Sequence, residues 1–363
     1  MLNNKKIHLH DIFLYQLIIL LIVAQLQLPN YILFVVIVIT FILFFVSEFN
    51  FKLTKNSLPM IVVICCLLID VYFRHSSMIV TLLIITLSIS LSTNELVKVY
   101  GSSQIITLVY TVSLAFLGIK QLYNGQDGVF EFGFRQKNLA GYYVFVISFL
   151  IFKFLKDKGI LKNIFALLIL FSVEYFLIKD RTASYLIVLY FVIFEYRLIP
   201  KNKISMTIIS LLPAVLTFFS LFLAENISKY AWISRFDYIL TSRIQLWAYY
   251  INSYKILWLP QNITTSFHSM YGSIPFDNAY LYYLLNEGIF QYSFIIILVV
   301  CALYLACKNR DIFIFGMLIT LVLYNFTEMI GFDAKSSILL PLSFLLLVQR
   351  NNNILSNKRK VIN

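Results

Sequence analysis

The residues of this 363-residue sequence best suited to chemistry are cations placed where predicted helices begin. Arg135 and Lys137 directly precede an apolar run that opens at Asn138, Arg181 precedes a later run, and Arg243 opens a predicted amphipathic helix. A guanidinium group matches phosphate oxygens with two parallel hydrogen bonds, and a helix N-terminus adds the positive end of its dipole. Together these cations predict a site for a pyrophosphate on a lipid carrier.

Each arginine taken alone has a simpler interpretation. It could bind a lipid headgroup, or it could pair with a nearby acid, as Arg181 could with Asp180 or Glu174. Convergence of several arginines on one site would favour the pyrophosphate interpretation, because charges near a membrane are costly unless they serve a function.

Carboxylates provide candidates for a general base. Asp277 and Glu287 flank the helix expected after a long polar segment, and Glu328 follows a late apolar run. A carboxylate can take the proton of a sugar hydroxyl. The alternative for each acid is a salt bridge to one of the arginines. His268 is a further candidate base, with a solvated loop histidine as its alternative.

Composition restricts the class of protein that can position these groups. Hydrophobic residues make up 60% of the chain and charged residues 13%, and the mean hydropathy is +0.85. We therefore expect an all-α integral membrane protein, a single domain over residues 1–363, with about 12 transmembrane helices. The apolar runs lie at about 12–28, 31–47, 58–73, 78–91, 104–119, 138–155, 160–178, 182–198, 204–224, 289–307, 311–327 and 337–349.

Charge and motifs exclude several functions. The net charge of +12 does not indicate nucleic-acid binding, because the Lys and Arg residues form short clusters between apolar runs. If the N-terminus is cytoplasmic, most of the Lys and Arg residues fall on the cytoplasmic side, as the positive-inside rule requires. Both termini are therefore expected to be cytoplasmic. The four cysteines lack metal or redox spacing, and no nucleotide-binding motif is present, so no metal and no cofactor is expected. Asp70 and Glu195 lie within apolar runs, and we expect them to form structural pairs.

Residues 225–288 form the longest segment between runs, which predicts a large structured extracytoplasmic loop between the ninth and tenth transmembrane helices. It contains an apolar stripe at helical spacing, with Thr241 or Ser242 near its start; the stripe consists of Leu240, Ile244, Trp247, Ile251 and Tyr254. This pattern predicts a helix that lies on the outer leaflet. The alternative is a helix packed on top of the bundle.

Short segments carry a resemblance to a known family. They are 132–138 (FGFRQKN), 180–184 (DRTAS), 242–247 (SRIQLW), 277–281 (DNAYL) closed by Glu287 and Gly288, and the pair Thr327 and Glu328. In this order, and with all of them expected on the outer side, the chain resembles bacterial Wzy-type O-antigen and capsular polysaccharide polymerases. That family shares its fold with the O-antigen ligases.

The resemblance implies an enzyme of the bacterial plasma (inner) membrane with its active site on the extracytoplasmic face. A sugar hydroxyl would attack the anomeric carbon of a repeat unit carried on undecaprenyl pyrophosphate. The implied partners are this lipid-linked oligosaccharide, membrane lipid, a chain-length regulator and a flippase. The implied catalytic residues are Arg181, Arg243, Asp277 and Glu328. Among substrate-binding residues, the resemblance implies Arg135, Asn138, Asn278 and Tyr280, and the residue chemistry and position add Lys137, Trp247, His268 and Glu287.

Three alternatives stay open. Ligases commonly carry a histidine where this chain has Asp277, which favours a polymerase over a ligase-like transferase. A flippase for the same lipid-linked sugar would need polar residues deep in its spans, whereas here they concentrate outside. A third class of lipid-dependent glycosyltransferase places an acid in the first outer loop, and the turn at Pro29 and Asn30 has none.

Overall fold

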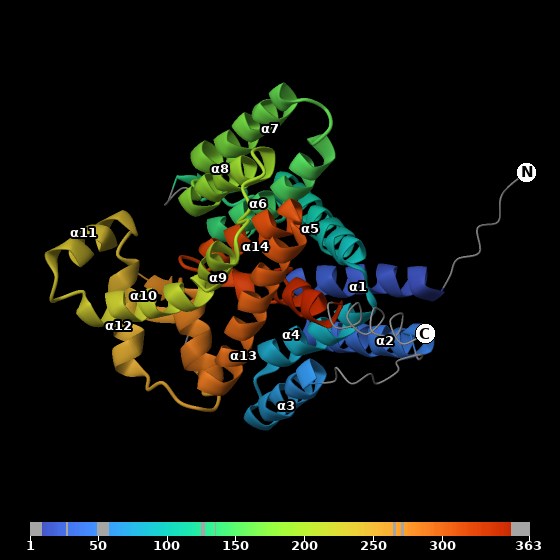
Figure 1. The fold of residues 1–363 in the computed structure, drawn as a ribbon, viewed down its shortest axis with the longest axis horizontal. Helices are drawn as coiled ribbons and strands as arrows, with labels where there is room; N and C mark the ends of the chain where they lie inside the picture. The colour runs from blue at the N-terminus through green and yellow to red at the C-terminus, as the bar shows by residue number, and fades with distance from the viewer. Residues whose placement is uncertain are drawn as a thin grey trace, which may run out of the picture.

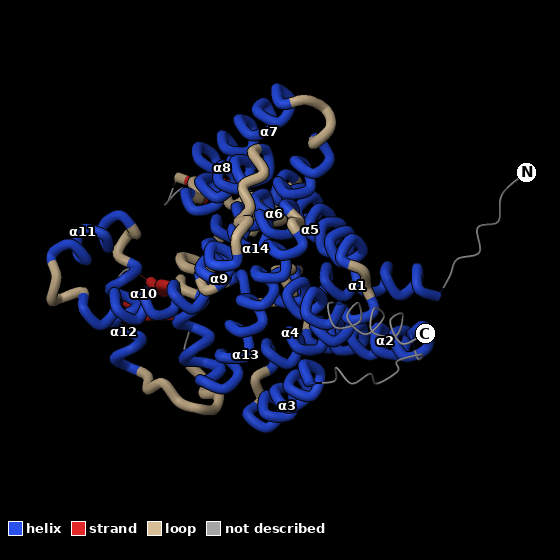
Figure 2. Tube along the Cα trace, viewed as in Figure 1, coloured by secondary structure: helices blue, strands red, loops and turns tan. Residues whose placement is uncertain are grey.

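The computed structural model describes residues 9–26, 28–48, 58–124, 128–134, 136–263, 266–269 and 272–349. This part of the chain is almost entirely helical (Figures 1 and 2), as expected from the sequence. Its strands form two short antiparallel hairpins, β1 (Tyr123–Asn124) with β2 (Val129–Phe130) and β3 (Ser266–Ser269) with β4 (Gly272–Pro275). The all-α prediction is therefore confirmed.

The helices follow the apolar runs of the sequence. The first group comprises α1 (Leu9–Gln25), α2 (Asn30–Glu48), α3 (Leu58–Phe73), α4 (Ser76–Leu87), α5 (Thr93–Phe116), α6 (Lys137–Leu155) and α7 (Ile160–Ser172), which continues as a π-helical turn, η2 (Val173–Ile178). The second comprises α8 (Arg181–Glu195), α9 (Lys203–Ser210), α10 (Leu212–Asn226), α11 (Ala231–Ile239), α12 (Arg243–Ser253), α13 (Ala279–Asn309), α14 (Ile312–Tyr324) and a last helix, Leu339–Gln349. Short 3₁₀ turns lie at Ser88–Ser90 and Ile330–Phe332.

Fewer of these helices reach membrane-spanning length than the sequence predicts. Four in the described part are long and apolar enough to cross a membrane, namely α5, α6, α7 with η2, and α13. The pair α9 and α10, bent by 43°, would be a fifth. Six further apolar helices, with α2 counted over Asn30–Phe44, have only 10–17 residues, below the roughly 20 that a bilayer requires. The structure thus supports four or five spans by length and composition, rather than about 12.

The centre of the molecule is formed by α13 and α14 (Figure 1). In the same view, α6, α7 and α8 lie at one end, α10, α11 and α12 at a second, and α1 to α4 at a third. Aromatic contacts join α6 to its neighbours: Phe145 is stacked on Tyr324 of α14 with 5.5 Å between ring centroids, and Phe149 lies tilted against Tyr190 of α8 at 4.5 Å. These contacts fix the ends of α6, α8 and α14 relative to one another.

The apolar stripe of α12 faces protein rather than lipid. Ile244, Trp247 and Tyr250 are buried in a small core that also contains Leu223 of α10 and Leu281 of α13. The structure therefore has the alternative arrangement, a helix packed on the bundle. The expected cap is also different. Ser242 precedes the helix without a side-chain capping bond, and the Oδ1 of Asp237 instead accepts from the backbone N–H of Ile244 at 2.7 Å.

A break divides α13 at Gly288, whose φ of 73° and ψ of 169° are not helical. An extended segment before the helix fills this break. The N–H of Ile289 donates to the carbonyl of Leu257 at 2.9 Å, and the N–H of Gln261 donates to the carbonyl of Asn286 at 2.9 Å. The backbone groups released by the break are thereby satisfied by another part of the chain, as a buried helix break requires.

Candidate functional site

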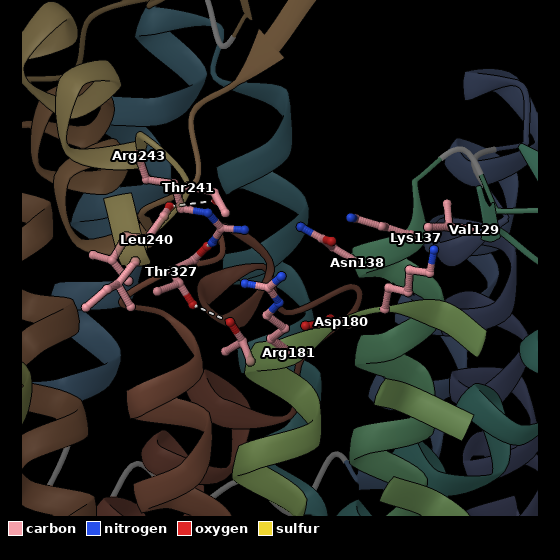
Figure 3. A pocket seen from close by; sticks show the side chains of 12 residues that line it. Val129, Lys137, Asn138, Asp180, Arg181, Leu240, Thr241, Arg243 and Thr327 are labelled. Carbon is pink, nitrogen blue, oxygen red and sulfur yellow. Dashed lines mark hydrogen bonds between the residues drawn. The ribbon is translucent and has the colours of Figure 1, made fainter. Parts of the chain in front are cut away.

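The starts of three helices meet around one pocket of about 240 Å³. The helices are α6, α8 and α12, and their first residues are Lys137, Arg181 and Arg243. Figure 3 shows Arg243 entering from one side, Lys137 and Asn138 from the opposite side, and Arg181 pointing up between them. The pocket is lined by Val129, Lys137, Asn138, Lys179, Asp180, Arg181, Thr182, Ile239, Leu240, Thr241, Arg243 and Thr327.

Three of the four cations of this pocket are free to bind an anion. Within the described residues, the side chains of Lys137, Lys179 and Arg181 have no hydrogen bond or ion pair. Arg181 therefore does not form the pair with Asp180 or Glu174 that was its alternative. Arg243 differs, because its Nη1 donates to the carbonyl of Thr327 and its Nη2 donates to Oε1 of Glu328 at 3.0 Å.

Two carboxylates form ion pairs with the guanidinium of Arg243, and a third, Asp180, interacts with it electrostatically. Glu328 is buried and accepts from Arg243 and, with both oxygens, from Nδ2 of Asn138 at 2.9 Å. The Oδ2 of Asp277 lies 3.7 Å from Nη2 of Arg243. Asp180 is buried and caps α8, since its Oδ1 accepts from the N–H of Ala183 at 3.1 Å. The cluster places one fixed cation among three acids.

Burial and mutual repulsion make these acids weak. Burial, with the nearby charge of Glu328, raises the pKa of Asp180 to about 7 and that of Asp277 to about 7. Burial also raises the pKa of Glu328, while Arg243 and Asn138 act in the opposite direction. A carboxyl group with a pKa near neutrality can both accept and release a proton at physiological pH, as general acid–base catalysis needs.

A glycine on α6 allows the acids to approach this helix. A Cβ at Gly141 would lie 2.5 Å from Oδ2 of Asp180 and 2.9 Å from Oε2 of Glu174. Glu174 belongs to the π-helical turn η2 and is fully buried, with neither carboxylate oxygen hydrogen bonded in the described structure. The sequence pattern treats Asp180 and Glu174 only as partners of Arg181, whereas here Asp180 lines the pocket and both acids lie against Gly141 of α6.

Other predicted site residues support the pocket from behind. Trp247 is buried and its Nε1 donates to the carbonyl of Asp277 at 3.2 Å. Asn278 is buried and caps α13, and its Nδ2 donates to the carbonyl of Phe326 at 3.1 Å. Tyr280 is fully buried and donates to a carbonyl of α14. These side chains hold the loops that carry Asp277 and Glu328, and none of the three lines the pocket.

Three predicted residues are not brought to the pocket or are not described. Glu287 lies at the break of α13, where it faces His75 instead of Arg243, because the first two turns of α13 carry it away from Asp277. Arg135 lies outside the described residues, and so does the side chain of His268.

No protein-family model, curated protein or solved structure matches the chain. The chemistry of the site is therefore inferred from the positions of its charged side chains. Free cations at the N-termini of two helices offer a site for a phosphate-bearing group. Beside them, carboxyl groups with pKa values near 7 offer a proton acceptor.

Proposed function

We propose that this chain is a polysaccharide polymerase, which joins oligosaccharide repeats carried on undecaprenyl pyrophosphate at the outer face of the bacterial plasma membrane. One observation carries the proposal: three unpaired cations, Lys137, Lys179 and Arg181, line the same pocket as Asp180 and Arg243. Directly behind Arg243 lie the carboxylates of Asp277 and Glu328, with which it forms ion pairs. A pyrophosphate leaving group and a nucleophilic hydroxyl need these two kinds of group side by side.

The pyrophosphate of the donor would bind to the unpaired cations and to the starts of α6 and α8. Asp277 or Asp180 would take the proton of the acceptor hydroxyl. The hydroxyl oxygen then bonds to the anomeric carbon of the donor, and the bond from that carbon to the phosphate oxygen breaks. Negative charge develops on the departing undecaprenyl pyrophosphate, where Arg181 and the lysines stabilise it. Arg243 holds Glu328 and Asp277 in place.

The distribution of charge supports an outward-facing pocket. The far end of the α6 helix carries Lys153, which lies over the ring of Phe313 at the start of α14. The connections and helix ends on this side also carry Lys156, Lys158, Lys162, Arg197, Lys201, Lys203, Lys308 and Arg310. Under the positive-inside rule this basic end is cytoplasmic, and the pocket faces out. We propose that the shorter apolar helices complete the set of about 12 spans.

Replacing Arg181 with alanine tests the proposal. The variant should lose long glycan while single repeats remain on the lipid, with a fall in polymerisation rate of about 10²–10³-fold. The assay is gel separation of products from purified protein and lipid-linked donor. Arg235→Ala is a matched control, because Arg235 is exposed on α11 and does not line the pocket. Wild-type chain lengths from Arg181→Ala would refute the assignment.

A deletion strain and the purified protein together separate the polymerase from the two alternatives. A flippase would leave single repeats on the cytoplasmic leaflet when the chain is deleted, whereas a polymerase would leave them on the outer leaflet. A ligase-like transferase would move glycan to an acceptor that is not carried on undecaprenyl pyrophosphate, and purified lipid-linked repeats alone would then give no longer product.

A further inference from the structure

A second group of ionisable side chains lies outside the pocket, where α13 is broken. Asp70 of α3, His75 of the turn before α4, and Glu287 beside Gly288 each offer one ligand atom, and these atoms lie within 4.8 Å of one another. All three side chains are buried, with relative exposures of 0%, 6% and 3%. Burying two carboxylates and an imidazole together is costly unless a further charge compensates them.

Each carboxylate of this group has one oxygen that accepts a hydrogen bond from an amide and one that accepts none, although Oε2 of Glu287 lies 3.5 Å from Nδ1 of His75. The Nε2 of Gln291 donates to Oδ1 of Asp70 at 3.0 Å, and the Nδ2 of Asn286 donates to Oε1 of Glu287 at 2.7 Å. The other oxygens, Oδ2 of Asp70 and Oε2 of Glu287, are buried and accept no hydrogen bond within the described structure. Amides that orient a carboxylate while leaving its second oxygen free are typical of the surroundings of a bound metal.

We propose that Asp70, His75 and Glu287 bind a divalent metal ion of the zinc or manganese class. One imidazole nitrogen and two carboxylate oxygens suit such ions, and two negative charges balance a divalent cation. Bonds of about 2.1 Å would place the ligand atoms about 3.4 Å apart. His75 Nδ1 and Glu287 Oε2 are already 3.5 Å apart, and all three ligand atoms lie within 4.8 Å of one another, so small side-chain shifts would complete the site.

This metal would join parts of the chain that are distant in sequence. Glu287 directly follows Asn286, which lies 211 residues after His75. Two of the ligands are therefore far apart in the chain, which explains why no metal-ligand spacing is visible in the sequence. The ion would tie the turn between α3 and α4 to the break of α13. The inference concerns metal binding alone and does not depend on the proposed polymerase activity.

Zinc titration of the untagged chain in detergent tests the inference. After dialysis against metal-free buffer, we expect calorimetry and elemental analysis to show one Zn²⁺ per chain, with micromolar or tighter affinity. His75→Ala should abolish this binding. Gln291→Ala removes an orienting amide but no ligand, and should weaken it about 10–100-fold. His10→Ala is the matched control, since His10 pairs with Glu95 and lies outside the group.

Cobalt binding to the unaltered chain tests the site without any substitution, so its result does not depend on whether the variants fold. Co²⁺ should give visible absorption bands that Zn²⁺ displaces at one equivalent. The inference is overturned if the folded unaltered chain binds no stoichiometric Zn²⁺. It is equally overturned if His75→Ala binds with unchanged affinity, or if His10→Ala is the variant that loses the ion.

Discussion

Replacing Arg243 with methionine should destabilise the protein far more at alkaline than at acidic pH. Methionine fills a similar volume but removes the guanidinium that donates to Glu328 and lies 3.7 Å from Asp277. Removing one partner of a buried ion pair costs about 3–5 kcal/mol, because the other charge stays buried without compensation. We expect a loss of this size at about pH 8, where the carboxyl groups are ionised.

Proton uptake reduces the loss at lower pH. The pKa of Asp180 and that of Asp277 are about 7 in the folded protein, well above the ordinary value of 3.8, although Arg243 lowers both. Without Arg243 these pKa values rise further. A carboxyl group whose folded pKa is raised binds protons on folding, so stability falls as pH rises from about 4 through the folded pKa. At about pH 5.5 Asp180 and Asp277 are neutral, which removes the repulsion that they would exert on the stranded Glu328, so much of the loss should disappear.

Thermal unfolding in detergent at both pH values measures the effect. The double variant Arg243→Met with Glu328→Gln removes the stranded charge as well, and should recover at least about 2 kcal/mol of the loss at pH 8. Arg235→Met, on the exposed face of α11, is the control and should have no effect. An equal loss at both pH values, or a double variant no more stable than the single one, would refute the buried carboxylate cluster.

Three further predictions concern Gly141, Gly288 at the break of α13, and the general base. Gly141→Ala should lower polymerisation more than 10-fold in a folded protein, because its Cβ would meet Oδ2 of Asp180 at 2.5 Å; normal rates would contradict this contact. Gly288→Ala should lower the melting temperature, since a φ of 73° costs a non-glycine residue about 1–2 kcal/mol and its Cβ would meet the carbonyl of Leu259 at 2.6 Å; an unchanged melting temperature would show that the break relaxes. The polymerisation rate should rise with pH, with the midpoint of the rise near pH 7, because the general base must be ionised. If Asp277 is the base, Asp277→Asn should remove this pH dependence. If a slower enzyme keeps it, Asp180 is the base.

Apolar runs in the sequence locate the helices but do not count the spans. Each of the runs coincides with a helix of the structure, because lipid-facing and core-facing residues are equally apolar. Hydropathy does not show where a helix stops. The run at 204–224 is bent by 43° between α9 and α10, shortly before Pro213, and α4 has only 12 residues. Helix length, which decides whether a segment can span, depends on packing that the sequence pattern does not contain.

The candidate site could be predicted only where chemistry coincides with a helix start. Lys137, Arg181 and Arg243 stand at the first positions of their helices, so their convergence could be anticipated. Asp180 could not be ranked as a site residue, since an aspartate before a helix is an ordinary cap. Glu287 shows the opposite error: it lies near Asp277 in sequence, but the direction of α13 separates the two.

The break at Gly288 also constrains how the chain is made. Under the proposed topology, the part of α13 after the break has about 21 residues and a length of about 31 Å, enough to enter the bilayer alone. The part before the break has exposed backbone groups until the segment around Leu257 reaches them. The segment around Leu257 is synthesised before α13, and under the proposed topology it stays outside the membrane until α13 has been inserted. Insertion of the helix and completion of its break are therefore separate events during biogenesis, and cells that translocate residues 225–288 slowly should accumulate an inserted but unfinished protein.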